Sequence, residues 1–236
     1  MNKVLIIIPA YNEAENIERV VDNIVENFSG YDYIVVNDGS KDNTVDVCRK
    51  RKYNFLDLSI NLGIGGAVQT GYKYAKDNGY DIAVQIDGDG QHDIAYLENM
   101  LQYLISGEAD IVIGSRFIEF EGFQSSAARR TGIKILSTLI FMCTGCKVRD
   151  VTSGFRAVNK RFIDIYARSY PNDYPEPEAI VAAVMQGGKI KECPVIMRER
   201  ENGTSSINFV KSIYYMIKVT LAILVCRLSF GIDKNI

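Results

Sequence analysis

Short apolar runs alternate with helix-like segments through the first half of the chain. The runs are rich in β-branched residues, as expected for strands that are buried on both faces of a parallel sheet. Strands are predicted at residues 4–8, 33–36, 56–60, 82–86 and 110–114. Helical spacing and capping residues predict helices at residues 14–27, 63–77 and 94–106, and a further helix that begins near Thr44.

This alternation predicts an α/β fold with a mostly parallel central sheet and helices on both faces. The chain has 236 residues, of which 47% are hydrophobic and 24% charged, so it can bury a substantial core. No linker-like segment divides it, and we predict one domain over residues 1–206, followed by a C-terminal helix over 207–236. A net charge of -2 gives no electrostatic reason to expect a nucleic-acid partner.

Polar residues follow the predicted strands at the points where the strands end, and this edge binds the ligands of parallel α/β sheets. Asp87-Gly88-Asp89 follows the fourth strand. Carboxylates at alternate positions can turn toward one cation, and the glycine leaves room for a bulky anionic ligand. Taken alone, the segment also fits an Asp-Gly turn. Turn residues do not predict acids after consecutive strands, so we favour a site for a metal and the diphosphate of a nucleotide sugar.

A glycine-rich segment, Gly63-Ile64-Gly65-Gly66, begins the predicted helix of residues 63–77. It lacks the GK[ST] ending of a P-loop, and Val68 stands where a dinucleotide fingerprint has its last glycine. Backbone N–H groups that bind an anion would explain the segment, and so would close packing of the helix on the sheet. The sequence leaves both explanations open.

Six motifs occur in order along the chain. They are Pro9-Ala10-Tyr11-Asn12-Glu13, Asn37-Asp38-Gly39-Ser40, Asn61-Leu62-Gly63, Asp87-Gly88-Asp89-Gly90-Gln91-His92, Gly114-Ser115-Arg116 and Thr152-Ser153-Gly154-Phe155-Arg156. Over roughly residues 3–206 their order resembles that of family 2 glycosyltransferases, above all polyprenol-phosphate sugar synthases of the dolichyl-phosphate mannose synthase type. The resemblance implies a GT-A fold, an inverting mechanism, a nucleotide-diphosphate sugar donor and a divalent cation.

The resemblance also implies roles for single residues on the donor side. Asp87 and Asp89 correspond to the metal and diphosphate pair, with Gln91 as a third ligand, and an all-oxygen set suits Mg²⁺ or Mn²⁺. Asp89 is catalytic in this interpretation, because the cation would offset the charge of the leaving nucleoside diphosphate. The donor nucleotide is predicted to contact Pro9, Tyr11, Glu13, Asp38, Asp87 and Gly88. His92, the only histidine, is interpreted as a loop residue.

On the acceptor side, the resemblance places Arg116, Arg130 and Arg200 near an acceptor phosphate, with Arg116 also counted as catalytic. Guanidinium forks match phosphate oxygens, although a single arginine is usually a solvated surface charge. The chain departs from the family at Gly203-Thr204-Ser205-Ser206, where a G-x-S-K sequence would supply a phosphate-binding lysine.

Glu176 and Glu178 fall where related transferases keep an acidic motif. A hydroxyl acceptor loses a proton as it attacks and needs a general base, whereas a phosphate acceptor is already an anion. We take Glu178 as the candidate base. The alternative is an acid that stabilises the start of the following helix.

The C-terminal segment has apolar residues at helical spacing, interrupted by Lys211, Lys218 and Arg227. Its apolar stretch is too short to span a bilayer, which needs about 20 residues. A helix in the membrane interface, a helix that docks on a small membrane-protein partner and a helix packed back on the domain all fit. The apolar run at residues 4–8 is too short for a signal peptide, so we predict a cytoplasmic protein, peripheral on the inner face of the cell membrane.

The leading hypothesis is an inverting glycosyltransferase that moves a sugar from a nucleotide-diphosphate sugar to a lipid-linked acceptor, most simply polyprenyl phosphate. Transfer to a sugar hydroxyl in cell-surface polysaccharide synthesis, onto a lipid-linked saccharide, is the first alternative. A sugar nucleotidyltransferase and a non-catalytic nucleotide-sugar-binding subunit are alternatives of another class. Tyr11-Asn12-Glu13 argues against the nucleotidyltransferase, because such enzymes usually have a glycine-rich, basic loop there.

Overall fold

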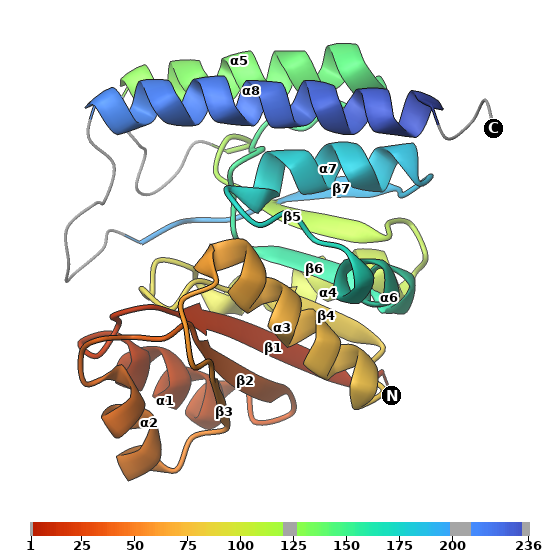
Figure 1. Ribbon diagram of the computed structural model, residues 1–236. Helices are drawn as coiled ribbons and strands as arrows, with labels where there is room; N and C mark the ends of the chain where they lie inside the picture. Colours follow the sequence, from red (N-terminus) through yellow and green to blue (C-terminus); the bar gives the residue numbers. More distant parts are fainter. Residues whose placement is uncertain (1, 120–126, 199–208, 233–236) are drawn as a thin grey trace.

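Seven strands form one sheet in the order β3-β2-β1-β4-β6-β5-β7 in the computed structural model, which describes residues 2–119, 127–198 and 209–232 (Figure 1). The strands are β1 (Val4–Ala10), β2 (Asp32–Asn37), β3 (Phe55–Asp57), β4 (Ile82–Gln85), β5 (Ile111–Ser115), β6 (Arg156–Asn159) and β7 (Ile190–Pro194). β6 runs antiparallel to both of its neighbours, and the other strand pairs are parallel. The predicted mostly parallel sheet is confirmed.

Helices cover both faces of this sheet, as predicted. They are α1 (Ile17–Asn27), α2 (Thr44–Arg51), α3 (Gly63–Asp77), α4 (Leu97–Ile105) after a short 3₁₀ turn η1 (Ile94–Tyr96), α5 (Ala127–Thr144), α6 (Lys160–Arg168), α7 (Pro175–Met185) and α8 (Phe209–Ile232). α1 begins three residues later than predicted. The N–H of Ala14 is bound by the Asp42 carboxylate instead of entering a helix, and the carbonyl of Glu13 accepts from the Asn16 and Ile17 N–H groups.

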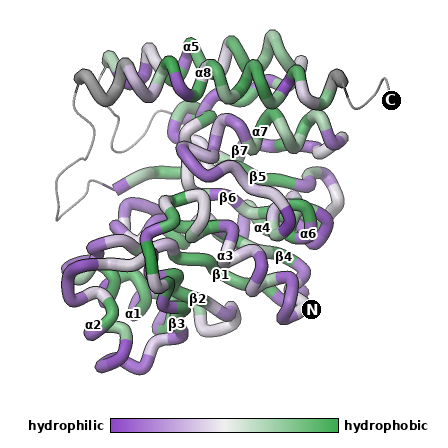
Figure 2. The backbone as a smooth tube through the Cα atoms, viewed as in Figure 1, coloured by the Kyte–Doolittle hydropathy of each residue, from purple (hydrophilic) through white to green (hydrophobic). Residues whose placement is uncertain are grey.

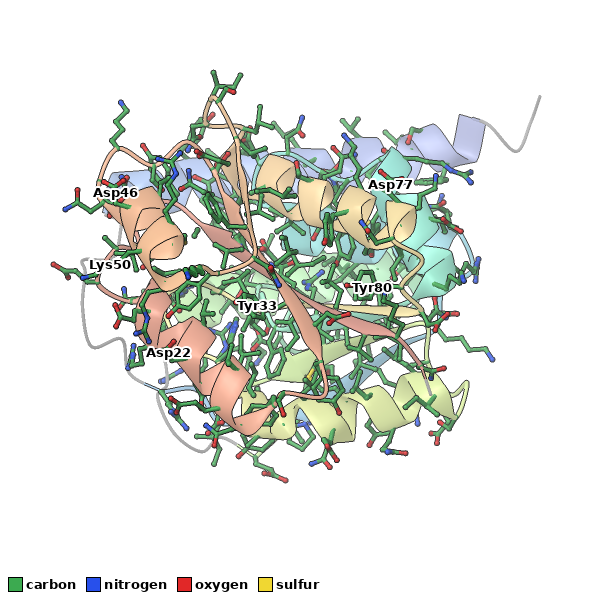
Figure 3. All side chains as sticks on the ribbon, turned by 90° about the horizontal axis from the view of Figure 1, so that it is seen from below. Asp22, Tyr33, Asp46, Lys50, Asp77 and Tyr80 are labelled. Carbon is green, nitrogen blue, oxygen red and sulfur yellow. The ribbon has the colours of Figure 1, made fainter. Side chains whose placement is uncertain are left out.

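The sheet divides the core into two layers, and β1 contributes side chains to both. Every residue of β1 is buried, and successive side chains point to opposite faces of the sheet. Leu5 and Ile7 pack with residues of α3 and α6, whereas Ile6 and Ile8 pack with residues of α1 and α4. Figure 2 shows the apolar strands enclosed between helices, and Figure 3 shows charged side chains such as Asp46 and Lys50 projecting outward. Burial on both faces explains why this strand reads as one continuous apolar run.

Two glycines bring α3 close to its neighbours. A Cβ on Gly71 would lie 2.3 Å from the Ile7 side chain of β1, and a Cβ on Gly65 would lie 2.0 Å from the Pro171 carbonyl oxygen. The Gly65 N–H donates to the Asn172 carbonyl at 3.0 Å. Close packing therefore accounts for Gly65, because its N–H is not available to an anion.

The C-terminal helix α8 packs back on the domain. It lies beside α5 and over α7, at one end of the molecule in Figure 1. Its inner residues Val219 and Ile223 are buried with the core of the α3 face. None of the helices in the described part of the chain is both long enough and apolar enough to cross a bilayer.

Candidate active site

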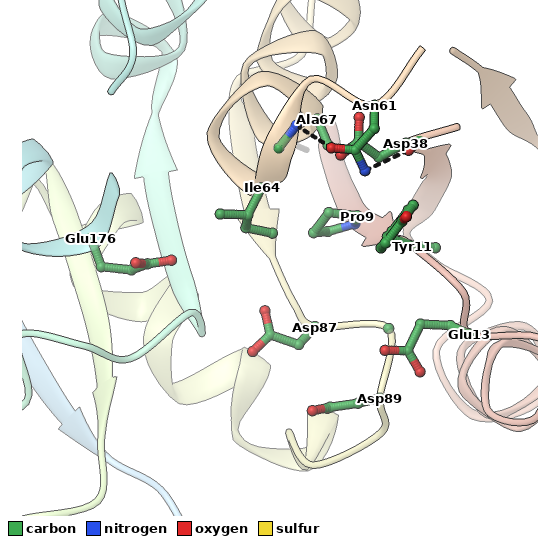
Figure 4. A pocket seen from close by; sticks show the side chains of 13 residues that line it. Pro9, Tyr11, Glu13, Asp38, Asn61, Ile64, Ala67, Asp87, Asp89 and Glu176 are labelled. Carbon is green, nitrogen blue, oxygen red and sulfur yellow. Dashed lines mark hydrogen bonds between the residues drawn. The ribbon is translucent and has the colours of Figure 1, made fainter. Parts of the chain in front are cut away.

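A pocket of about 430 Å³ opens at the carboxyl ends of β1, β2 and β4 (Figure 4). Its lining residues are Pro9, Ala10, Tyr11, Glu13, Asp38, Asn61, Gly63, Ile64, Ala67, Asp87, Gly88, Asp89 and Glu176. They come from four of the predicted motifs, from the first turns of α3 and from the start of α7. The parallel strands end at one edge of the sheet and bring these segments together, although up to 167 residues separate them along the chain (176 minus 9).

The loop after β1 is held in place by the loop after β2. Asn12 has a left-handed backbone, with φ at 56°, and its N–H donates to Ser40 Oγ at 2.9 Å. The next N–H, that of Glu13, donates to Thr44 Oγ1 at 3.0 Å. These bonds leave Tyr11 43% exposed at the pocket and bring Glu13 into its wall.

Asp38 supports the part of the wall that is formed by the start of α3. It is 3% exposed, and its Oδ1 accepts from the Leu62 N–H at 2.7 Å. Its carbonyl accepts from Asn61 Nδ2 at 3.0 Å, so the segment that begins α3 is tied to the end of β2. One carboxylate oxygen is thus used by the protein itself, and Asp38 can offer the other to a ligand.

Asp87 and Asp89 point into the same pocket from the loop after β4 (Figure 4). Asp89 Oδ1 accepts from the Gln91 N–H at 3.0 Å, which fixes its carboxylate. Between them, a Cβ on Gly88 would lie 3.0 Å from the Pro9 carbonyl oxygen, so any larger residue would crowd the end of β1. Gly88 is therefore explained by packing on β1 as well as by ligand access.

The charge of the pocket fits a divalent cation. Five of the thirteen lining residues are acids, and none of the thirteen is basic. A diphosphate would be repelled by these carboxylates unless a cation lay between them. Asp87 and Asp89 present hard oxygen ligands of the kind that Mg²⁺ and Mn²⁺ prefer. Among the described residues no cluster of three or more His, Cys, Asp or Glu forms a metal site.

Glu176 faces the pocket from the first turn of α7, across from Tyr11 and Glu13 (Figure 4). Burial raises the pKa of Glu176 to about 7; nearby Arg156 opposes this rise, and Asp87 adds to it. Arg156 is itself buried and donates to the carbonyls of Ser153 and Glu176. It thereby ties the loop before β6 to the start of α7, which positions the acid.

Glu178, predicted as the base, does not line this pocket. It lines a separate cavity of about 620 Å³ between α6, α7 and α8. Residues two apart on a helix point in directions about 200° apart, so only one of the two acids could face the strand ends. The predicted base Glu178 therefore lies outside this pocket, whereas Glu176 of the same motif lines it. The helical spacing could have shown that Glu176 and Glu178 do not both face the pocket, but not which of them does.

Arg116 is occupied by a buried ion pair. Its Nε and Nη2 donate to the two carboxylate oxygens of Asp150 at 2.7 Å each, and Nη2 also donates to Thr152 Oγ1 at 3.1 Å. Arg116 is 6% exposed and Asp150 is fully buried. This fork therefore joins β5 to the loop before β6, and the prediction that Arg116 is catalytic and binds an acceptor phosphate is not supported. Asp150 was missed, since nothing in its local sequence indicates a partner 34 residues away.

Three other predicted residues lie apart from the pocket lining or beyond the described chain. Gln91, predicted as a metal ligand, donates from Nε2 to the Arg198 carbonyl at 3.3 Å and is not among the lining residues. Arg130 lies in the first turn of α5, exposed and outside the pocket lining. Arg200 lies outside the described residues. Asn61 and Ile64 do line the pocket, although no role was predicted for them.

Residues 5–166 match the family model described as glycosyl transferase family 2. The chain belongs to this family. This family 2 glycosyltransferase is 31% identical over 215 residues to the UDP-N-acetylglucosamine–dolichyl-phosphate N-acetylglucosaminyltransferase of Methanococcus voltae, which covers 81% of this chain and 84% of the relative. It is 27% identical over 216 residues to the polyprenol monophosphomannose synthase of Mycolicibacterium smegmatis, with 87% of this chain and 81% of that protein covered.

A solved structure with the same fold is glucosyl-3-phosphoglycerate synthase from Mycobacterium tuberculosis, in complex with Mn²⁺, UDP and glucosyl-3-phosphoglycerate. The TM-score is 0.69 at 20% identity, and the likeness covers 96% of this glycosyltransferase and 80% of that chain. The predicted GT-A fold and the predicted enzyme class are confirmed. Membership of the family argues against the sugar nucleotidyltransferase and the non-catalytic subunit.

Proposed function

We propose that this enzyme transfers a sugar from a nucleotide-diphosphate sugar to polyprenyl phosphate, with inversion at the anomeric carbon. The observation that carries the donor half is the pocket at the strand ends, which is lined by five acids and by Tyr11 and Pro9. The names of two relatives include dolichyl phosphate and polyprenol monophosphomannose, and these names support polyprenyl phosphate as the acceptor.

On the donor side, Pro9 and Tyr11 would pack against the base. Glu13 and the second oxygen of Asp38 would accept hydrogen bonds from base N–H groups and ribose hydroxyls. Asp87 and Asp89 would hold Mg²⁺ or Mn²⁺, which, when bound, would offset the negative charge of the leaving diphosphate. Gly88 leaves the end of β1 open to the diphosphate, because it has no side chain.

On the acceptor side, an oxygen of the polyprenyl phosphate would attack the anomeric carbon from the face opposite the diphosphate. The new C–O bond forms as the bond between the anomeric carbon and the diphosphate oxygen breaks, and the nucleoside diphosphate leaves. No general base is required, since the attacking oxygen is already anionic. Arg130 and Arg200 remain the predicted ligands of the acceptor phosphate.

An exposed apolar surface supports a position at the membrane. It consists of Tyr214, Ile217, Leu221, Leu224, Val225 and Leu228 on α8, together with Ile135, Phe141 and Met142 on α5. We call these nine residues the apolar platform; each is between 40% and 70% exposed. On α8 they form one stripe, opposite the residues that pack on the domain. We infer that the platform lies in the membrane interface on the inner face of the cell membrane, or binds a small membrane protein there.

The function is tested by incubating the enzyme with a panel of nucleotide sugars, Mn²⁺ and short-chain polyprenyl phosphate, and by reading the products by mass. We expect a glycosyl-phospho-polyprenol from at least one donor. Asp89→Asn and removal of the cation by EDTA should each lower turnover by about 100-fold or more. Products that appear only when a lipid-linked saccharide replaces polyprenyl phosphate would contradict the proposed acceptor.

Glu176 favours a second candidate, transfer to a sugar hydroxyl. An acid with a pKa of about 7 that faces the pocket suits a general base at neutral pH. Glu176→Gln separates the two candidates. Turnover should fall by about 10²- to 10⁴-fold if a hydroxyl is deprotonated, and should stay within a few-fold of the wild type if the acceptor is a phosphate.

A further inference from the structure

The single histidine of the chain lies directly behind Asp87. The His92 side chain is 1% exposed, and its Nδ1 accepts from the Asp87 N–H at 3.0 Å. An Nδ1 that accepts has no hydrogen of its own, so the neutral ring carries its proton on Nε2. His92 is thereby fixed as a donor at Nε2.

That donor faces the carboxylate of the same aspartate. His92 Nε2 lies 3.6 Å from Asp87 Oδ2 and makes no hydrogen bond within the described residues. The separation is longer than a hydrogen bond, and a buried donor without a partner is unfavourable by about 1–3 kcal/mol. A shift of less than about 1 Å in the Asp87 side chain would close the contact.

The ring cannot readily turn away from Asp87. It stacks on Phe155, with ring centroids 5.2 Å apart and an angle of 24° between the planes. The backbone of His92 forms a bridge with Met197. On its other side the Asp87 carboxylate lies against Gly154, where a Cβ would be 2.6 Å from Oδ1. The carboxylate therefore lies between a fixed N–H donor and the backbone of a residue without a side chain.

We propose that His92 is a positioning residue: its Nε2–H orients the Asp87 carboxylate so that the remaining oxygen lone pairs point into the pocket toward the donor's cation. The inference rests on the proposed donor site and gives a role to a residue that the sequence analysis interpreted only as part of a loop. A partner of this kind, behind a metal ligand, fixes ligand orientation and typically changes metal affinity by about 10- to 100-fold when removed.

Two amide variants of His92 distinguish the roles of the two ring nitrogens. In His92→Gln the amide nitrogen reaches the place of Nε2, so the donor to the carboxylate is kept and the acceptor for the Asp87 N–H is lost. In His92→Asn the amide oxygen reaches the place of Nδ1, so the acceptor is kept and the donor is lost. Mn²⁺ alone is the probe, and its binding is measured by the decrease of the free-ion electron paramagnetic resonance signal.

We expect His92→Asn to weaken Mn²⁺ binding by about 10- to 100-fold and His92→Gln to change it by less than about threefold. Equal losses of Mn²⁺ affinity in both variants, or a larger loss in His92→Gln than in His92→Asn, would overturn the proposal. His92 would then be a packing residue. Asp89→Asn is the reference: if it abolishes binding while both His92 variants bind normally, the donor site stands and only the role of His92 fails. If the wild type binds no Mn²⁺, both ideas fail.

A second measurement does not depend on the variants folding. Because the chain has one histidine, ¹⁵N-labelled histidine reports on His92 alone in a nuclear magnetic resonance spectrum of the wild-type protein. We expect the neutral ring to be the Nε2–H tautomer. The Nδ1–H tautomer would contradict the proposal, because Nε2 could then not donate to Asp87.

Discussion

The buried carboxylates in and around the site are stabilised in different ways. Asp150 is fully buried and is matched by the guanidinium of Arg116, which donates two hydrogen bonds to it. Asp38 and Asp89 accept from backbone N–H groups. Glu176 has the neighbouring Arg156, but burial outweighs its effect and raises the pKa of Glu176 to about 7. An acid in that state can carry a proton or release it near neutral pH, which suits a reacting site better than a structural one.

The raised pKa of Glu176 predicts a pH-dependent stability. The folded protein keeps this proton up to about pH 7, whereas an unfolded chain loses it near the ordinary value of 4.5. Between these values the folded state binds more protons, so this group's contribution falls as pH rises and is lost above about pH 7. Glu176→Gln should therefore stabilise the ligand-free protein at pH 8, by roughly 1–3 kcal/mol, and make no gain at pH 4.

Denaturant unfolding of the wild type and of Glu176→Gln from pH 4 to pH 9 measures this difference. Glu26→Gln, on the exposed face of α1, is the matched control and should give a curve parallel to the wild type. A Glu176→Gln curve that is also parallel to the wild type would show that the acid is solvated.

Individual elements are positioned by close backbone contacts. α3 lies against β1 through Gly71 and against the loop before α7 through Gly65. The contact at Gly65 joins the start of α3, which lines the pocket through Gly63 and Ile64, to the segment that leads to Glu176. The two walls of the pocket are thus linked through one glycine.

Gly65→Ala tests this link between elements. Alanine favours a helix over glycine by up to about 1 kcal/mol, but the added Cβ would lie 2.0 Å from the Pro171 carbonyl oxygen, which is backbone and cannot move alone. The steric clash should outweigh the gain in helix propensity, so the free energy of unfolding should fall by about 1–3 kcal/mol. Gly30→Ala, where a Cβ would meet nothing within 4 Å, is the control. A stabilised Gly65→Ala protein would refute the close contact.

At the scale of the whole molecule, the site and the apolar platform lie on different parts of the surface. The pocket opens at the carboxyl ends of β1, β2 and β4, and α5 and α8 lie beyond β5, β7 and α7 (Figure 1). α8 has apolar residues on two sides: one side packs on the domain, and the other belongs to the platform. The surface of a soluble protein rarely exposes so many apolar residues together, so we expect the platform to contact a membrane or another protein.

Binding to vesicles tests the platform. Vesicles of phosphatidylcholine with one quarter phosphatidylglycerol should float the wild-type protein, and Leu221→Gln with Leu228→Gln should weaken binding by about 10- to 100-fold, at roughly 1 kcal/mol or more for each lost leucine. Ile105→Gln on α4 is the control, because Ile105 is 54% exposed and lies outside the platform. Equal flotation of all three proteins would contradict membrane binding by these helices.

Much of the fold could be predicted because local pattern and burial coincide. Four of the first five strands, β1, β2, β4 and β5, are largely buried runs that the apolar pattern indicates, whereas β3 is partly exposed and ends at Asp57, three residues before the predicted end. Their parallel arrangement brings the donor motifs to one edge. β6 and β7 were not predicted. β6 begins at the buried Arg156, and β7 contains the charged residues Lys191 and Glu192 side by side, so neither strand has a continuous apolar run.

The sequence by itself determined the approximate positions of the first five strands and the family, and it indicated candidate donor-binding residues, since periodicity and motifs can be recognised along the chain. Tertiary structure alone decided that Glu176 rather than Glu178 faces the pocket and that Asp150 occupies Arg116. It also decided that His92 lies against Asp87, and that one side of α8 is buried while the other is exposed. The physical reason is common to these cases: which way a side chain points, and which distant group it meets, depends on packing between elements that spacing along the chain does not encode.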